Sequence, residues 1–537
     1  MRVSSPVNPT EKRSQKQRRI NRDLTMNHSV VQARENSIGW GLSYQYLSAT
    51  TFVASGGIFY IIVAKLLPTS ALGAISLLLA IASLMNIAFS FGFPISAQHF
   101  ISFNLGIGDH AETRSVARKI LMISSILSSV SLIFSLVTAR WVAILFFHAP
   151  YDTLLIEAAS FYIAIGVFFG VLHGSALGFQ MFRTDAIIYL SSASFSYLLG
   201  LLLLLLFHGI IYLIIGMTIC YLYGTVLYLI YIFFKGPKVT RQSNKTSLPV
   251  ILSYSWPILL SGLIGYGSTY VDRFVVAYFL NLSTLGIYSF VLLISSSLSF
   301  LGGPIANVLV PKLSEYFSID DNEKLKKGIN LSSTVMMLVY SPLALGLASI
   351  APVALPLLAR PIYATGNAAL MILLVTSSIF VLSGIMGSVI YAVRKTGVYV
   401  TTTALTLVSN LALSFLLIPR YGMIGAAIAN SSVSVVAFII LYHYAVGVRL
   451  KNFDWNTILK VWFSSLIMFV LVTAERTVLG NSLHLLPLYV ATGVFYYWIA
   501  INITRPLHRL QREVFLSYIP SRFGIRKIIS IFIIRAF

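Results

Sequence analysis

Long apolar windows recur along nearly the whole chain and are separated by short breaks that contain polar residues, proline or glycine. A helix that crosses a bilayer needs about 20 mostly apolar residues. The pattern predicts fourteen such helices, over 40–64, 71–96, 117–138, 154–179, 186–206, 210–234, 250–280, 284–310, 329–350, 367–392, 397–418, 423–446, 456–474 and 485–503. We therefore expect an all-α, polytopic membrane protein with about fourteen transmembrane helices.

The composition agrees with this class. Of the 537 residues, 57% are hydrophobic and only 10% are charged, and the mean hydropathy is +0.85. A soluble protein of this size needs far more polar surface. The single cysteine, Cys220, lies in an apolar window, which excludes an intrachain disulfide framework. Residues 1–36 are polar and basic and lack the apolar core of a removable signal peptide.

The formal charge of +22 has two interpretations, a nucleic-acid partner or a bias of bases toward cytoplasmic loops. If the N-terminus lies inside, 32 of the 38 lysines and arginines fall in cytoplasmic segments or in the two tails. This asymmetry favours the second interpretation, with both termini cytoplasmic in a multi-pass plasma membrane protein and no nucleic acid. The basic tails would attract anionic membrane lipids. The last stretch, 524–537, is too short to span and is predicted to be either an interfacial helix or a frayed tail.

A constant shift of 213 residues superposes several small-residue features, which indicates an internal repeat. The matches are SALG (70–73) with STLG (283–286), Ser76 with Ser289, Gly174-Ser175 with Gly387-Ser388, and Gly209 with Gly422. Six helices per unit is an even number, so the two units share one orientation. Transporters use parallel halves of this kind to enclose a cavity that opens alternately to each side.

The repeat predicts the organisation of the whole chain. The expected parts are a basic cytoplasmic tail (1–37), an N-terminal six-helix lobe (38–245), a C-terminal six-helix lobe (246–450), two additional transmembrane helices (451–504) and a basic amphipathic cytoplasmic tail (505–537). Catalytic chemistry is not expected, because the nine histidines show no metal-ligand spacing and no glycine-rich phosphate loop precedes a helix. No cofactor or metal is predicted.

Three stretches carry a resemblance to a known family. They are IIVAKLLPTSALGAISLLLAIASLMNIAFSFGFPIS (61–96), SYSWPILLSG leading to VDRFVVAYFLNLSTLGIYSF (253–290), and NLALSFLLIPRYGMIGAAIANSSVSVV (410–436). The last stretch resembles the family's hairpin, an IP-x-x-G turn followed by G-A-A-x-A. Over roughly residues 38–450 the chain resembles polysaccharide flippases of the Wzx kind, within the multidrug/oligosaccharidyl-lipid/polysaccharide exporter superfamily.

The resemblance implies a flippase that moves a polyprenyl-(di)phosphate-linked oligosaccharide from the cytoplasmic to the outer leaflet, for surface polysaccharide or glycoprotein biosynthesis. It implies partners from the same pathway, either glycosyltransferases or a polymerase. Three alternatives remain open: a cation-coupled multidrug or metabolite antiporter of the same fold, a membrane enzyme of glycan assembly, and a scaffold within an assembly complex.

One acid and one base stand side by side inside a predicted span, in TYVDRFVVAYFL (269–280). An ionisable residue at this depth is costly and is expected to face the bundle interior. Adjacent helical residues point about 100° apart, so Asp272 and Arg273 need not pair with each other. In the functional interpretation Arg273 faces the cavity and attracts a phosphate, while Asp272 orients it or binds a coupling cation. In the structural interpretation they hold neighbouring helices together.

The other candidate substrate-binding residues each have a structural alternative. Tyr266 and Tyr270 precede the charged pair at helical spacing, and either stack on sugar rings or pack in the core. His173 lies in the middle of a span, and Gln98 and His99 lie at a helix end, where packing through hydrogen bonds is the alternative. The last candidate, Lys65, lies near a helix end and is also explained by a side chain that reaches for the interface.

Overall fold

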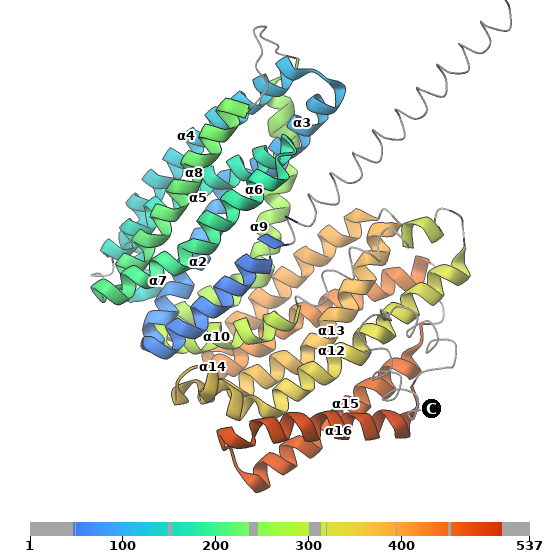
Figure 1. Cartoon of the computed structure of the whole chain (residues 1–537). Helices are drawn as coiled ribbons and strands as arrows, with labels where there is room; N and C mark the ends of the chain where they lie inside the picture. Colours follow the sequence, from blue (N-terminus) through green and yellow to red (C-terminus); the bar gives the residue numbers. More distant parts are fainter. Residues whose placement is uncertain are drawn as a thin grey trace, which may run out of the picture.

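The computed structural model describes residues 44, 47, 48, 50–148, 153–235, 245–299, 313–317, 319, 321–393, 395–448 and 453–506. Over these ranges the chain is almost entirely helical and forms no strand (Figure 1). The predicted all-α class is confirmed. The basic N-terminal tail (1–37) and the C-terminal tail beyond Pro506 lie outside the described residues, so the interfacial helix stays a prediction.

The described helices follow one another in chain order. They are Thr50–Leu66, α2 (Thr69–Ser90), α3 (Phe93–Ile107), α4 (His110–Val142) with η1 (Ala143–Phe147), α5 (Thr153–Gly178), α6 (Phe182–Tyr189), η3 (Leu190–Ser194), α7 (Phe195–Phe207), α8 (Ile210–Lys235), α9 (Leu248–Phe279), α10 (Leu282–Ser299), α12 (Asn322–Leu358), η4 (Pro361–Gly366), α13 (Asn367–Ala392), α14 (Thr396–Val448), α15 (Trp455–Leu479), η5 (Leu483–Leu485) and α16 (Leu486–Thr504). Among the described residues, eleven helices are long and apolar enough to cross a membrane, and two shorter apolar helices accompany them. The count of fourteen stays a prediction.

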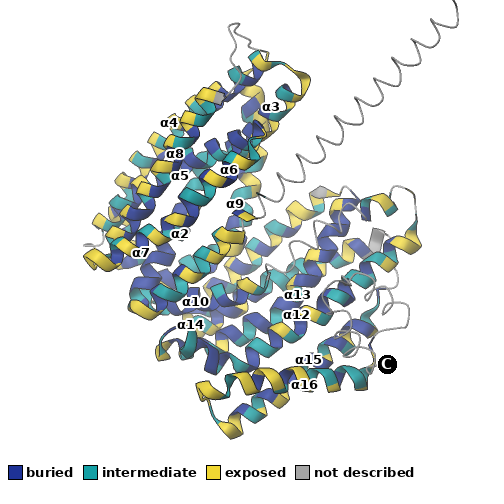
Figure 2. Ribbon diagram, in the orientation of Figure 1, coloured by how far each residue is buried: buried dark blue, intermediate teal, exposed yellow. Residues whose placement is uncertain are grey.

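The outer faces of the bundle are apolar, as a lipid-embedded protein requires. Along α4, for example, Met122, Ile126, Ile133 and Val137 are 60–70% exposed. Figure 2 shows the exposed positions along the outer sides of the helices and the buried ones between them. In water such a continuous apolar face would be unfavourable, whereas hydrocarbon solvates it. The chain is a multi-pass membrane protein.

Two backbone breaks interrupt the helices, one inside a predicted span and one between two predicted spans. The predicted span 71–96 runs through the end of α2, where Phe91 and Gly92 both have positive φ values of 52° and 73°. A Cβ atom on Gly92 would lie 2.6 Å from the Ser255 carbonyl oxygen of α9, so this turn requires glycine for its conformation and for the close approach. The chain resumes as α3, with Pro94 in its first turn.

The second break lies within α14, at Gly422, whose φ is 56° and ψ is −133°. The two parts of α14 run back alongside each other, because Ser409 Oγ donates to Ser432 Oγ at 3.0 Å. Gly422 therefore separates the two spans that the sequence predicts at 397–418 and 423–446.

The centre of the molecule is a crossing of α2 and α10. A Cβ on Gly73 would lie 1.8 Å from the Leu282 carbonyl oxygen, and a Cβ on Gly286 would lie 1.9 Å from the Thr69 carbonyl oxygen. Ser76 Oγ donates to Ser289 Oγ at 2.7 Å, across a separation of 213 residues. The shift of 213 residues converts the Gly73–Leu282 contact into the Gly286–Thr69 contact, because Gly73 corresponds to Gly286 and Thr69 to Leu282. Two helices that cross at a two-fold axis form such reciprocal contacts.

Helix α9 passes from one set of helices to the other. Its first turns contact α3, where Ser255 Oγ lies 2.7 Å from Ser96 Oγ. Its later turns contact α14, where Ser268 Oγ lies 2.8 Å from Thr406 Oγ1. The second part of α9, between these two sets, carries the charged pair.

Candidate functional site

Asp272 is fully buried and joins three segments of the chain. Its Oδ2 accepts hydrogen bonds from Tyr288 Oη of α10 at 2.5 Å and from Asn430 Nδ2 of α14 at 3.0 Å. Its Oδ1 accepts from the backbone N–H of Arg273 at 2.9 Å. A buried carboxylate with this many donors is well satisfied. These contacts join α9 to α10 and α14, so they favour the structural interpretation, in which Asp272 holds neighbouring helices together.

Arg273 is arranged differently, with its guanidinium against an aromatic ring. The Cζ atom lies 4.3 Å from the centre of the Tyr270 ring, within the range of a cation–π contact. Among the described residues, none offers a hydrogen-bond partner to the buried Nε of Arg273. The residue as a whole is only half-buried and forms no ion pair among the described residues, so its guanidinium is suited to an incoming anion.

Two tyrosines support this guanidinium. Tyr266 and Tyr270 stack with ring centres 4.4 Å apart and an interplanar angle of 14°. The hydroxyl of Tyr266 donates to the carbonyl oxygen of Ala80 on α2 at 2.5 Å. The row Tyr266, Tyr270, Arg273 therefore lies on the side of α9 that faces the first set of helices, with Tyr266 anchored to that set.

Tyr60 completes this group from the first half of the chain. It lies close enough to Arg273 for the arginine charge to act on it. Tyr60 and Arg273 are also 213 residues apart, the separation of the Ser76–Ser289 pair. Positions related by a two-fold axis approach each other only near the axis, so Arg273 lies near the centre of the molecule. The two equivalent positions are chemically unequal, since one is a phenol and the other a cation.

His173 belongs to a separate buried group. Its Nδ1 lies 2.7 Å from Asp185 Oδ1, and Tyr228 Oη donates to the same carboxylate oxygen at 2.7 Å. The Tyr189 ring lies 5.0 Å from the imidazole. This group connects α5, α6 and α8, all in the first half of the chain, and is not part of the Arg273 group.

The remaining candidates also lie apart from Arg273. His99 is exposed on α3 and stacks on Tyr254 of α9 at 4.6 Å, with Gln98 exposed beside it. Tyr254 and Arg273 are nineteen residues apart on one helix, about 28 Å along its axis. Lys65 is exposed at the end of the helix Thr50–Leu66, as expected of a base that reaches the interface.

Sequence reasoning missed the partners of the two buried carboxylates. Tyr288 and Asn430 hold Asp272, and Tyr228 holds Asp185. No local motif indicates these contacts, because 158 residues separate Asn430 from Asp272. The position of Tyr60 could be predicted from the sequence, since the shift of 213 residues makes it equivalent to Arg273.

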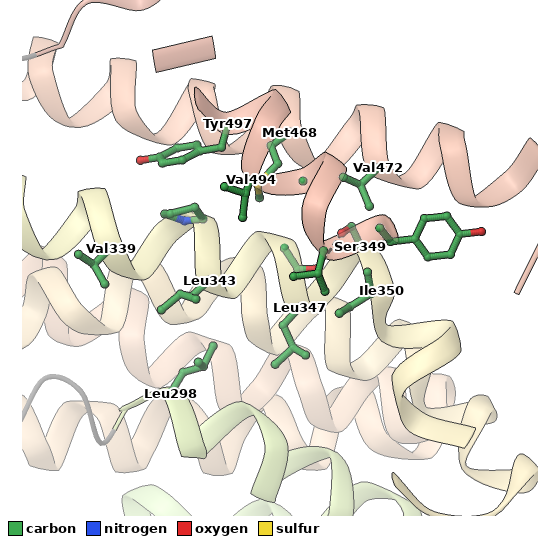
Figure 3. Close-up of a pocket in the computed structure, with 15 residues that line it drawn as sticks. Leu298, Val339, Leu343, Leu347, Ser349, Ile350, Met468, Val472, Val494 and Tyr497 are labelled. Carbon is green, nitrogen blue, oxygen red and sulfur yellow. Dashed lines mark hydrogen bonds between the residues drawn. The ribbon is translucent and has the colours of Figure 1, made fainter. Parts of the chain in front are cut away.

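An apolar groove lies between α12, α15 and α16, with a volume of 510 Å³ (Figure 3). Leu343 and Leu347 of α12 point into it, facing Met468 of α15 and Val494 of α16, and Leu298 of α10 closes one side. Ser349, Tyr489 and Tyr497 are the polar residues among its lining. The groove is suited to a hydrocarbon chain.

The all-helical bundle, its apolar outer faces and its central crossing define a multi-pass membrane protein. The family model described as "Polysaccharide biosynthesis protein" matches residues 62–360, more than half of the chain. The chain belongs to this polysaccharide biosynthesis protein family.

Two curated relatives are similar over part of their length. The probable low-salt glycan biosynthesis flippase Agl15 of Haloferax volcanii is 22% identical over 271 residues, which cover 50% of this chain and 57% of that protein. The capsular polysaccharide biosynthesis protein CapF of Staphylococcus aureus is 27% identical over 214 residues, 38% of this chain and 52% of that protein. The chain thus spans about half the length of the curated relatives that it matches.

Solved structures share the fold over most of the chain. The inward closed conformation of lipid II flippase MurJ superposes with a TM-score of 0.68 at 15% identity, covering 86% of this chain and 98% of that one. An inward-facing multidrug resistance transporter of the MATE family gives 0.64 at 17% identity, covering 75% and 95%. At these identities the likeness shows the fold alone.

Proposed function

We propose that this protein is a flippase that moves a polyprenyl-(di)phosphate-linked oligosaccharide from the cytoplasmic to the outer leaflet by alternating access. The observation that carries the proposal is Arg273. Its half-buried guanidinium lies near the axis between the two sets of helices, with a tyrosine ring on one side and no ion pair to a carboxylate among the described residues. A phosphate or diphosphate is the substrate group that matches such a cation. The names of the curated relatives, a probable glycan flippase and a capsular polysaccharide biosynthesis protein, support the same substrate class.

The apolar groove of α12, α15 and α16 would hold part of the polyprenyl chain. Its walls are mainly leucine, valine, isoleucine and methionine, with Ser349, Tyr489 and Tyr497 as the polar residues. A polyprenyl chain is favoured in apolar surroundings, so the tail of a lipid-linked substrate stays in the bilayer or on an apolar surface of the protein. Figure 3 shows the side chains that would contact the chain.

The proposal includes the organisation of the chain. Residues 38–245 and 246–450 form two lobes of like orientation that rock about the α2–α10 crossing, and 451–504 add two helices outside them. Reciprocal contacts at Gly73 and Gly286 support this arrangement. Both termini lie in the cytoplasm, the protein resides in the plasma membrane, and it works with the glycosyltransferases or polymerase of its pathway. A membrane potential that is negative inside favours outward movement of an anion, by about 2.3 kcal/mol per charge per 100 mV.

The test is the location of the lipid-linked glycan in cells that lack this protein. We expect the glycan to accumulate on the cytoplasmic leaflet, wild-type protein to restore its outward appearance, and Arg273→Gln to fail at an unchanged amount of folded protein. Arg140→Gln is the matched control, because Arg140 is an exposed cation in the last turn of α4. Normal outward appearance of the glycan in the deletion strain would refute the proposal.

The same cells separate the flippase from a multidrug antiporter. An antiporter would change resistance to organic cations and leave the glycan in place. The fold does not separate the two functions, because the MATE transporter shares it. The charge of Arg273 does bear on the choice, since no carboxylate among the described residues forms an ion pair with it. A cation at the centre favours an anionic substrate over a cationic one.

A further inference from the structure

A cavity of 800 Å³, with uncharged walls that carry several hydroxyl groups, lies between α9, α13 and both parts of α14. Its volume falls within the range of about 300–1,000 Å³ that is usual for small-molecule sites. It is separate from Arg273, which lies on another side of α9 and does not line it. The sides of the cavity come from Ser261–Thr269 of α9, Phe380–Tyr391 of α13, and Tyr399–Thr406 and Val433–Leu441 of α14.

Hydroxyl groups dominate the polar part of the lining, and none of its residues is charged. Several of these hydroxyls donate to carbonyl oxygens of their own helix, as Ser388 does to Gly384, Thr402 to Val398 and Thr403 to Tyr399. A hydroxyl has one donor and two acceptor lone pairs. With the donors used inside the helices, the walls offer mainly acceptors to a ligand.

This chemistry selects the class of ligand. An anion or a cation would lose its hydration without a counter-charge, which is unfavourable. A neutral polyol supplies many O–H donors and fits the acceptors. At one end, the rings of Tyr391 and Tyr399 lie 4.9 Å apart and are 44% and 41% exposed, beside Phe380, so an apolar face is also available. A pyranose ring has both a rim of hydroxyls and an apolar face.

The first half of the chain carries aromatic rings at the equivalent positions. Under the shift of 213, Gly265, Thr402 and Ser434 of the cavity correspond to Phe52, Tyr189 and Tyr221. In the first half these rings are packed together: Phe52 lies 5.7 Å from Tyr189. Tyr221 lies 4.8 Å from Phe169. Small and hydroxyl-bearing residues thus line a cavity in the second half, at positions where the first half has packed aromatic rings.

We propose that the cavity between α9, α13 and α14 binds a neutral sugar residue of the transported glycan, while its phosphate is held at Arg273. This inference rests on the proposed function, and it adds a second, uncharged site in the second half of the chain. The two sites lie along the same helix, α9. The charged phosphate would bind at Arg273, and an uncharged sugar would bind in the cavity.

Gly384 gives direct access to the cavity. It lines the cavity and is exposed in α13, and a Cβ atom built on it meets no other atom within 4 Å. A larger side chain is therefore accommodated by the fold and projects into the space that the sugar would occupy. Gly106 near the end of α3 has the same open surroundings outside the cavity and is the matched control.

The experiment uses full-length protein in lipid vesicles. Cys220, the one cysteine of the sequence, is buried in α8 and is replaced by alanine, and a single cysteine is introduced as Gly384→Cys. The rate of reaction with N-ethylmaleimide is measured with two lipids, the glycan-bearing polyprenyl diphosphate extracted from the same cells and sugar-free polyprenyl diphosphate. We expect the glycan-bearing lipid to slow the reaction at least about fivefold, the sugar-free lipid to leave it unchanged, and Gly106→Cys to be insensitive to both.

Transport of the glycan-bearing lipid is measured in parallel, with Gly384→Leu and Gly106→Leu in vesicles. We expect Gly384→Leu to lose at least about tenfold in rate and Gly106→Leu to match the wild type. Equal maleimide rates with both lipids, or protection by the sugar-free lipid alone, would overturn the sugar site while wild-type transport persists. Absence of wild-type transport would instead overturn the proposed function, so the two failures are distinguishable. Protection by the organic cation tetraphenylphosphonium, with none by the glycan lipid, would assign the cavity to a cationic ligand and overturn the inference.

Discussion

Two adjacent residues, Asp272 and Arg273, have opposite kinds of surroundings. The carboxylate is fully buried and accepts three hydrogen bonds from α9, α10 and α14. The guanidinium is half-buried against Tyr270 and keeps an Nε without a partner among the described residues. We infer that Asp272 holds helices together and that Arg273 is the residue that meets substrate.

At Arg273 we predict a graded loss of anion binding. Arg273→Gln should weaken binding of polyprenyl diphosphate to the purified protein roughly ten- to hundredfold, because a hydrogen bond to a charged group contributes about 1.5–3 kcal/mol. Arg273→Lys should lie between, since it keeps the charge and loses the planar guanidinium that stacks on Tyr270. Equilibrium binding in vesicles measures both. Unchanged affinity in Arg273→Gln would remove the residue from the site.

At Asp272 we predict a loss of stability. Tyr288→Phe removes a hydrogen bond to a buried carboxylate and should lower the free energy of unfolding by about 1.5–3 kcal/mol. Tyr278→Phe, on the exposed side of α9, should stay within about 0.5 kcal/mol of the wild type. Unfolding in detergent measures both variants. Equal stability of the two would show that the Tyr288 contact does not hold the helices.

Two elements, α2 and α10, meet with almost no space between their backbones. Gly73→Ala would place a methyl group 1.8 Å from the Leu282 carbonyl oxygen. Overpacking usually costs about 1–3 kcal/mol, and a clash with backbone should reach the top of that range or exceed it. The control is Gly57→Ala, where a Cβ meets nothing within 4 Å and the helix should gain up to about 1 kcal/mol. Thermal unfolding of both proteins tests the crossing. A stable Gly73→Ala protein would contradict it.

A second element-scale feature connects the start of α4 to the residues that precede α9. Glu112 accepts hydrogen bonds from the backbone N–H groups of Lys245 and Thr246 at 2.9 and 2.8 Å. Lys245 Nζ lies 2.6 Å from Asp109 Oδ2. The hydrogen bond from Lys245, and then that from the backbone N–H of Glu112, lower the pKa of Asp109 below its usual value of 3.8.

The lowered pKa predicts how stability depends on pH. The ionised form of Asp109 is favoured in the folded protein, so its contribution is present above its unfolded pKa and is lost as the pH falls through the folded value. The difference in melting temperature between wild type and Asp109→Asn should therefore be constant above about pH 5 and should close below about pH 4. A difference that grows on acidification would contradict this linkage.

At the scale of the whole molecule, hydropathy sufficed for the class, because lipid-facing helices must be apolar along their length. The shift of 213 also came from sequence, through small residues such as Gly73 and Ser76, and the structure places these at the α2–α10 crossing. Helices that cross closely require small residues, so two repeated helices that cross near the axis carry small residues at equivalent positions of the sequence.

The contacts between distant helices could not be predicted. Nothing local links Asp272 to Asn430 or His173 to Asp185 and Tyr228, because the choice of partner depends on how helices are rotated and packed. The predicted span 71–96 missed the break at Phe91 and Gly92 for the same reason, since it is the approach of α9 that requires the glycine. The cavity of the second half could not be predicted either, because it depends on how α9, α13 and both parts of α14 pack together.

We propose that one chain carries an anionic glycan lipid across the bilayer by way of Arg273. The most direct measurement is transbilayer movement in vesicles that contain only the purified protein and a trace of the glycan-bearing polyprenyl diphosphate. We expect wild-type protein to make the glycan accessible on the opposite leaflet within minutes. Arg273→Gln should do so at least about tenfold more slowly, and Arg140→Gln should equal the wild type. Equal rates for wild-type and protein-free vesicles, or for wild type and Arg273→Gln, would contradict it.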